Sequence, residues 1–343
     1  MEMGMLGLPR SGKSTLFEIM TGLSGRDSRG ELYHRGLATV PDSRFDHLVE
    51  VFAPMKISPA RVPFIDAGIR GESAGDSIRQ ALNGTDGLVH VVDGFSTQNI
   101  QEIISRYRTL EDDLILADLL IVENRLDRMA KIPTKALKPM DVTHLQLLPQ
   151  LKEGLEQGIP LRAQNLSQEE TFSLKSFSFL TIRPELVVIN LGEDRPLVAD
   201  AFDGMTDFPP PVIGINCQIE AEMTRLTPSE QQEFLASLDI DEPAFERIIR
   251  TAFSLLGRIS YFTVGEDEVK AWVIPSGSRA PQAAAAIHED FERGFIKAEV
   301  VSYEDFVDCG NTLAGAKASG RLRLEGKDYV VKDGDIISFR FNI

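Results

Sequence analysis

Residues 7–15 are Gly7-Leu8-Pro9-Arg10-Ser11-Gly12-Lys13-Ser14-Thr15, which fits the pattern G-x-x-x-x-G-K-[ST]. The apolar residues 3–8 are expected to form a short buried strand, and a helical pattern follows from about Lys13 to Thr21. Glycines let such a loop fold tightly, so that its N–H groups point at phosphate oxygens, and the N-terminus of the next helix adds partial positive charge. The stretch therefore predicts a phosphate-binding loop between a strand and a helix.

The side chains of this loop suggest specific tasks. Six residues are predicted to cradle the phosphates of a nucleoside triphosphate: Arg10, Ser11, Gly12, Lys13, Ser14 and Thr15. Lys13 is expected to reach the β- and γ-phosphates and to neutralise the charge that develops during hydrolysis. Ser14 is expected to ligate Mg²⁺ through its hydroxyl group.

A second contact to Mg²⁺ is expected from Asp66, which follows the apolar run at residues 62–65. We predict that its carboxylate holds the ion through water, with a turn residue at a strand end as the alternative. The usual Asp-x-x-Gly motif is contracted here to Asp66-Ala67-Gly68. Ile69 then stands where a water-orienting glutamine is expected, so hydrolysis would rest on positioning and charge stabilisation.

A candidate base-binding motif, Asn190-Leu191-Gly192-Glu193, follows the apolar run at residues 186–189. GTPases carry Asn-Lys-x-Asp at this place, and the aspartate accepts hydrogen bonds from guanine N1–H and the 2-amino group, which adenine lacks. The longer Glu193 would place its oxygens elsewhere, and Leu191 cannot replace the lysine. The motif therefore disfavours guanine, although an ordinary turn that enters a helix would also fit these four residues.

Short apolar runs without strict alternation recur at residues 62–65, 87–92, 186–189 and 212–215. Such runs are typical of parallel strands that are covered on both faces. Helical patterns lie between them, so we expect a three-layer α/β domain with a mostly parallel sheet. We assign residues 1–98 and 183–268 to this P-loop nucleotide-binding domain.

Two further parts are expected. Residues 99–182 carry long helical periodicity, and a hairpin of two antiparallel helices would let each bury its apolar stripe. This arm could be a packing hairpin or a partner-binding element, and the sequence favours neither. Residues 269–343 carry several short strand patterns, including residues 329–331, and a helix at residues 281–292, which is the size of a β-grasp domain.

The composition bounds the class of protein. The chain has 343 residues, of which 43% are hydrophobic, so it can bury sizeable cores. No apolar stretch approaches the roughly 18 residues that a membrane-spanning helix needs. The two cysteines, Cys217 and Cys309, are far apart and exclude a disulfide framework. The net charge of −16 argues against a nonspecific electrostatic grip on nucleic acid. We therefore expect a cytoplasmic protein with no membrane or DNA partner.

The chain resembles the YchF/Obg-like ATPases, a branch of the translation-factor-related P-loop GTPases. The resemblance spans nearly the whole chain. Its segments are residues 7–17 (GLPRSGKSTLF), 190–193 (NLGE), 217–222 (CQIEAE), 280–284 (APQAA), 290–300 (DFERGFIKAEV), 324–329 (LEGKDY), 331–335 (VKDGD) and 339–342 (FRFN).

The resemblance implies a nucleotide domain, an inserted coiled-coil-like arm and a C-terminal TGS-type β-grasp domain. It implies slow hydrolysis of ATP in preference to GTP, a requirement for Mg²⁺ and association with ribosomes. By the same resemblance, Asn190 and Glu193 would face the base, and the loop that contains Cys217 and Gln218 would border it. The family's first switch segment carries a threonine, but residues 26–38 contain none.

Two hypotheses of different classes follow. The first is a cytosolic ATPase, with GTP as the alternative nucleotide, whose arm and β-grasp domain report the nucleotide state to a partner such as the ribosome. The second is a nucleotide-gated binding module that scarcely hydrolyses, because the first switch and the Asp66-Ala67-Gly68 segment are altered. A small-molecule kinase is a weaker third hypothesis, since no acceptor site or lid is visible in the sequence.

Overall fold

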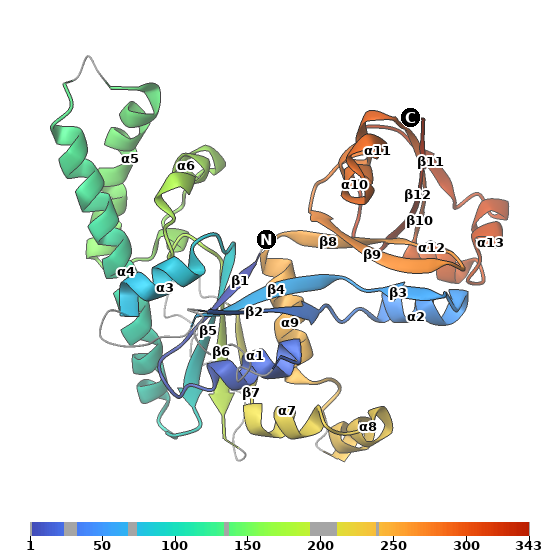
Figure 1. Ribbon diagram of the computed structural model, residues 1–343, viewed down its shortest axis with the longest axis horizontal. Helices are drawn as coiled ribbons and strands as arrows, with labels where there is room; N and C mark the ends of the chain where they lie inside the picture. Colours follow the sequence, from blue (N-terminus) through green and yellow to red (C-terminus); the bar gives the residue numbers. More distant parts are fainter. Residues whose placement is uncertain are drawn as a thin grey trace. The chain divides into compact units, whose positions relative to one another are not determined.

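The computed structural model describes residues 2–23, 33–67, 74–133, 137–192, 211–237 and 240–342 (Figure 1). Contacts between residues group the chain into two compact units. One unit contains Met1–Ala38 and Pro63–Ile248, and the other contains Thr39–Val62 and Ile249–Ile343. Among the described residues, no helix is long and apolar enough to span a bilayer.

The first unit is built on a six-stranded sheet of order β2-β4-β1-β5-β6-β7. Its strands are β1 (Met3–Leu6), β2 (Tyr33–Thr39), β4 (Arg61–Ala67), β5 (Gly87–Gly94), β6 (Glu185–Leu191) and β7 (Val212–Ile215). The pairings of β1 with β4 and β5, of β5 with β6, and of β6 with β7 are parallel. Every residue of β1 and β6 is buried, which explains their unbroken apolar runs. The predicted α/β fold with a mostly parallel sheet is confirmed.

Five helices of the described part of the chain, besides those of the arm, belong wholly or partly to this unit. They are α1 (Lys13–Thr21), α3 (Ala74–Leu82), α7 (Cys217–Met223), α8 (Pro228–Ser237) and α9 (Ala244–Leu255), whose last residues belong to the second unit. Leu82 of α3 and Leu110 of the arm pack with Leu6 and Leu88 of the sheet in one buried cluster. The apolar side chains that the sequence places on strands and helices thus meet in a shared core.

The predicted helical hairpin is confirmed as α4 (Ile100–Ala130) and α5 (Pro139–Glu156), which lie side by side (Figure 1). Asn99 caps α4 by accepting a hydrogen bond from the Gln101 amide, and α5 begins at a proline, which suits a first helical turn. The first half of α4 packs on the sheet, whereas its second half packs on α5 in a separate core. The short helices η2 (Leu161–Ala163), α6 (Gln168–Ser173) and η3 (Lys175–Phe177) follow.

The second unit contains a six-stranded sheet of order β11-β10-β12-β8-β9-β3. Its strands are β3 (Lys56–Ser58), β8 (Arg258–Thr263), β9 (Glu268–Pro275), β10 (Phe295–Ser302), β11 (Arg323–Glu325) and β12 (Asp335–Phe341). Its helices are α2 (Ser43–Phe52), α10 (Ala280–Ile287), α11 (Glu289–Arg293), α12 (Tyr303–Asp308) and α13 (Leu313–Ala318). β3 pairs with β9 in parallel, although the two strands are about 210 residues apart in the chain. No local sequence pattern predicts this pairing. The assignment of residues 1–98, 99–182, 183–268 and 269–343 to three domains stays a prediction.

Two local expectations for the second unit were wrong. The helix predicted at residues 281–292 is split at His288, whose backbone is extended and whose Nδ1 accepts a hydrogen bond from the Asp290 amide. The imidazole thereby caps α11, which a periodicity pattern cannot reveal. The strand predicted at residues 329–331 is reduced to one bridge between Val330 and Arg279.

Candidate phosphate-binding site

The loop between β1 and α1 encloses a cavity of about 380 Å³. Its lining consists of Gly7, Leu8, Pro9, Arg10, Ser11, Gly12, Lys13, Ser14, Thr15, His34 and Asp66. The structure therefore brings Asp66, at the end of β4, to the loop that was predicted to cradle phosphates. His34 of β2 also lines the cavity, and nothing in its neighbouring sequence marked it.

Two glycines allow the loop to turn so tightly. A Cβ atom on Gly7 would lie 2.5 Å from the Val91 carbonyl oxygen of β5. Gly12 has a φ of 94°, and a Cβ there would lie 2.2 Å from Nδ2 of Asn190. Backbone atoms at these two positions approach β5 and β6 more closely than any side chain permits. The glycines of the motif are thus required by packing against the sheet.

Lys13, Ser14 and Asp66 form one connected group at the cavity. The Lys13 Nζ donates a hydrogen bond of 2.8 Å to the Ala67 carbonyl and pairs with the Asp66 carboxylate. The Ser14 hydroxyl donates a hydrogen bond of 2.9 Å to Oδ2 of Asp66. Burial lowers the pKa of Lys13 to about 8, because removing the ammonium group from water disfavours its charged form. Anionic phosphates would favour that charged form again.

Ser14 and Asp66 also fit a magnesium ion. Their oxygens converge within hydrogen-bond distance at the cavity, and hydroxyl and carboxylate oxygens are the hard donors that Mg²⁺ prefers. Mg²⁺ keeps several of its waters when it binds to proteins, so an indirect contact from Asp66 agrees with this chemistry.

Asn190 holds the loop in place from β6. Its Nδ2 donates a hydrogen bond of 3.0 Å to the Ser11 carbonyl, and its Oδ1 accepts one of 3.1 Å from the Cys217 amide at the start of α7. The side chain is buried and therefore connects the phosphate loop with α7. The sequence did not indicate this connection, because the three residues are distant along the chain. The predicted contact of Asn190 with a base stays a prediction.

We expect the substitution Asn190→Ala to weaken both the fold and nucleotide binding. It leaves the Ser11 carbonyl and the Cys217 amide without their partner, at about 1–3 kcal/mol for each buried group that stays unpaired. Urea unfolding and nucleotide titration measure the two effects. Asn216→Ala is the matched control, because Asn216 accepts hydrogen bonds from the Gln218 and Ile219 amides of the same helix. It should lower stability and reduce affinity less than Asn190→Ala does; equal affinity loss in both variants would contradict this role of Asn190.

Of the three other residues predicted at the base, the structure describes Cys217 and Gln218 but not Glu193. Cys217 and Gln218 open α7, where Cys217 is buried and Gln218 is exposed. Burial raises the pKa of the Cys217 thiol to about 12, which favours its protonated form. Glu193 lies outside the described residues, as do Gly68 and Ile69.

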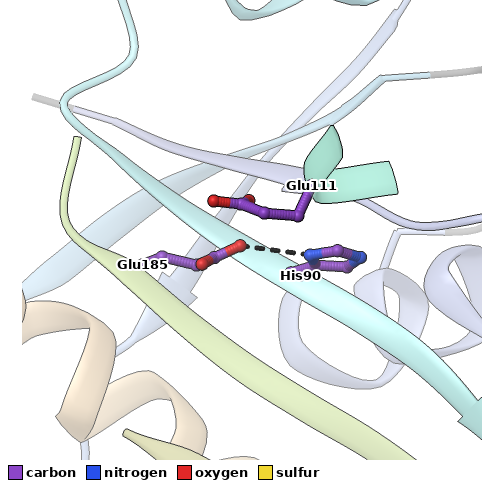
Figure 2. A group of neighbouring side chains, drawn as sticks. All are labelled: His90, Glu111 and Glu185. Atoms are coloured by element: carbon purple, nitrogen blue, oxygen red, sulfur yellow. Dashed lines mark hydrogen bonds and ion pairs between the residues drawn. The ribbon is translucent and has the colours of Figure 1, made fainter. Parts of the chain in front are cut away.

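A second cluster of ionisable side chains lies in the core of the same unit (Figure 2). His90 of β5, Glu111 of α4 and Glu185 of β6 are buried, and their ligand atoms lie within 4.8 Å of one another. The three residues come from elements that are distant along the chain, so no local spacing of metal-ligand residues connects them. The set has the composition of a metal site.

An arginine supplies the positive charge in this cluster. The Arg162 guanidinium forms ion pairs with both Glu111 and Glu185. Glu185 also accepts a hydrogen bond of 3.1 Å from the Tyr107 hydroxyl, and its other oxygen lies 3.1 Å from His90 Nδ1. A metal ion on the two carboxylates would have to displace the guanidinium. We therefore assign the cluster a structural role that joins α4 and η2 to β5 and β6.

The chain is similar to known proteins along its whole length. The family model YchF-GTPase_C, described as "Protein of unknown function (DUF933)", matches residues 258–342. The "Ribosome-binding ATPase YchF" of Bacillus subtilis is 38% identical, and that of Haemophilus influenzae is 36% identical, each with 99% of both chains covered. The "Structure of the Schizosaccharomyces pombe YchF GTPase" matches with a TM-score of 0.85 and 26% identity, covering 99% of this chain and 97% of that one.

Proposed function

The chain belongs to the YchF family of P-loop nucleotide-binding ATPases, and from that premise we propose that it is a Mg²⁺-dependent, ribosome-associated ATPase of the cytoplasm. ATP is the proposed nucleotide in preference to GTP. The convergence of Lys13, Ser14 and Asp66 on the cavity of the 7–15 loop is the observation that supports this proposal most strongly. The ribosome as partner rests on the names of the curated relatives.

The geometry supports the following roles. The loop amides and the N-terminus of α1 bind the phosphates, and Lys13 exchanges its contacts with Asp66 and Ala67 for contacts to the β- and γ-phosphates. Ser14 and Asp66 would hold Mg²⁺, which neutralises charge on the phosphate oxygens when it is bound. Asn190 keeps the Ser11 peptide oriented. Glu193, Cys217 and Gln218 are proposed to border the base, with Arg10, Gly12 and Thr15 completing the phosphate cradle.

A nucleotide-gated binding module is the second candidate. It is favoured by the contracted Asp66-Ala67-Gly68 segment and by the absence of a threonine from residues 26–38, since both altered segments normally sense the γ-phosphate. Such a module would bind nucleotide and partner but would turn over little.

Phosphate release distinguishes the two candidates. We expect the wild-type protein with Mg-ATP to release phosphate faster than its Lys13→Ala variant does, more slowly with GTP, and faster still when ribosomes are present. Co-sedimentation with ribosomes in ADP and in a non-hydrolysable triphosphate measures partner binding separately. If wild type releases phosphate no faster than Lys13→Ala does, and yet co-sediments with ribosomes in a nucleotide-dependent way, the binding module is favoured instead.

A further inference from the structure

We propose that Arg10 is a catalytic residue, which supplies a guanidinium group from within the phosphate loop to the terminal phosphates of the bound nucleotide. This proposal rests on the proposed function, because it requires a triphosphate in the cavity. It concerns the side chain of Arg10, whereas the cradle described above needs only the backbone at this position.

The backbone at Arg10 is in a conformation that does not suit an arginine. The Ser11 amide donates a hydrogen bond of 3.1 Å to the Leu8 carbonyl, so residues 8–11 form a tight turn. Pro9 occupies its second position, and Arg10 occupies its third with a φ of 70°. A proline followed by a residue of positive φ is the type II pattern, in which glycine or asparagine is preferred at the third position. An arginine is disfavoured there because of its Cβ atom.

Strained residues of this kind gather at ligand clamps and active sites. Of the non-glycine residues with positive φ in the described ranges, only Arg10 lines the cavity. The side chain is exposed and has no hydrogen bond or ion pair within the part of the chain that the structure describes. Packing and pairing there do not account for an arginine at this turn, which leaves a ligand as the reason.

The charges around the cavity assign that ligand. Lys13 is already engaged by Asp66 and the Ala67 carbonyl, so its charge is partly compensated before a nucleotide arrives. Arg10 has no such carboxylate among the described residues. A planar guanidinium offers several N–H donors in a fixed fork that matches phosphate oxygens, which the point charge of a lysine does not. The Arg10 guanidinium is thus a cation whose donors match the arrangement of oxygens on a phosphate.

Hydrolysis gives this guanidinium a task. A water oxygen bonds to the γ-phosphorus while the bond from that phosphorus to the β,γ-bridging oxygen breaks. The electron pair stays on the bridging oxygen, and of the two water protons one remains on the released phosphate and one passes to solvent. Negative charge grows on the bridging oxygen, and an arginine stabilises it in other phosphoryl-transfer sites. Arg10 would supply this stabilisation in a chain that has Ile69 in place of a water-orienting glutamine.

Two substitutions separate the side chain from the backbone. Arg10→Gly removes the guanidinium and relieves the strained turn, whereas Arg10→Ala removes the guanidinium and keeps a Cβ atom at positive φ. We expect kcat for ATP to fall about 100-fold in both variants, with an ADP dissociation constant within threefold of wild type. The melting temperature of Arg10→Gly should be equal to or above that of wild type. Guanidinium ions at millimolar concentration should restore part of the lost rate in both variants.

Three outcomes would overturn the proposal. One is a kcat of Arg10→Ala within threefold of wild type, and another is a lowered melting temperature of Arg10→Gly, which would make the arginine structural. The third outcome applies if wild type binds nucleotide without hydrolysing it. The measured quantity is then the affinity for a non-hydrolysable triphosphate divided by the affinity for ADP. A ratio in both variants that equals the wild-type ratio would overturn the proposal. A wild-type protein that binds no nucleotide would instead refute the proposed function itself, and calorimetry with ADP makes that distinction first.

Discussion

Replacing Lys13 by alanine is expected to reduce nucleotide affinity below the detection limit of calorimetry. Lys13 is 9% exposed, and its ammonium group compensates the buried Asp66 carboxylate. Without it, Asp66 presents an unpaired negative charge to an anionic ligand, and the ligand loses its principal cationic contact. Removing one partner of a buried ion pair costs about 3–5 kcal/mol in the free energy of unfolding, so Lys13→Ala should also be less stable than wild type.

A double variant separates the lost contact from the uncompensated carboxylate. Lys13→Ala with Asp66→Asn removes both charges, so its unfolding free energy should recover toward the wild-type value while nucleotide binding stays lost. Urea unfolding and titration with ATP and ADP measure the two quantities on the same preparations. Binding by Lys13→Ala within threefold of wild type would refute the assignment of the phosphate loop.

Arg162→Met is expected to be the most destabilising single substitution in the core of the first unit. It leaves the carboxylates of Glu111 and Glu185 buried beside each other without their shared cation. One oxygen of Glu111 is already buried without a hydrogen-bond partner. The Glu111 carboxylate would therefore lose its compensating charge at a place where it already lacks a hydrogen bond. We expect a loss of about 3–5 kcal/mol in the free energy of unfolding, measured with urea.

The matched control is the triple variant Arg162→Met, Glu111→Gln, Glu185→Gln. Glutamine keeps the volume of glutamate without its charge, so the part of the loss that comes from unpaired buried charge should be recovered. Recovery would assign the loss to unpaired charge, whereas a triple variant as unstable as Arg162→Met would assign it to packing.

The pH dependence of stability provides a second test of the ion pairs that Glu185 makes. Burial by itself would raise the pKa of Glu185, but Arg162, His90 and Tyr107 outweigh it and hold the pKa at about 2. The folded pKa lies below the ordinary value of 4.5, so the stabilisation is present above that value and is lost as the pH falls toward 2. Burial and the neighbouring Glu185 raise the pKa of Glu111 instead. Wild type should therefore lose stability between about pH 4.5 and 2 more steeply than Glu185→Gln does.

Much of the nucleotide site could be predicted from local sequence. Gly12, Lys13 and Ser14 occur in a fixed spacing because a backbone that wraps a phosphate needs those residue types in that order. The structure places all three, with Asp66, around one cavity. The unbroken apolar run of β6 likewise indicated a fully buried parallel strand, which the structure has.

Contacts between distant segments could not be predicted in this way. Asn190 was predicted to face a base, which stays a prediction, and the structure shows it fixing the Ser11 peptide and the start of α7. His34 reaches the cavity through the neighbouring strand β2, and no motif surrounds it. The fold also brings Glu111 and Glu185 to His90 (Figure 2), and Arg162 to the two carboxylates.

The sequence by itself determined the phosphate loop, the parallel α/β sheet and the helical hairpin, because each depends on residue types repeated at short spacings along the chain. Tertiary structure alone decided which residues serve the loop from outside. It paired β3 with β9 across the chain, set Asn190 against Gly12, gave the buried carboxylates Arg162 as their cation, and left Arg10 exposed at the cavity. Such contacts depend on the order of strands in a sheet and on the packing of helices upon it, and neither is encoded in any short window of sequence.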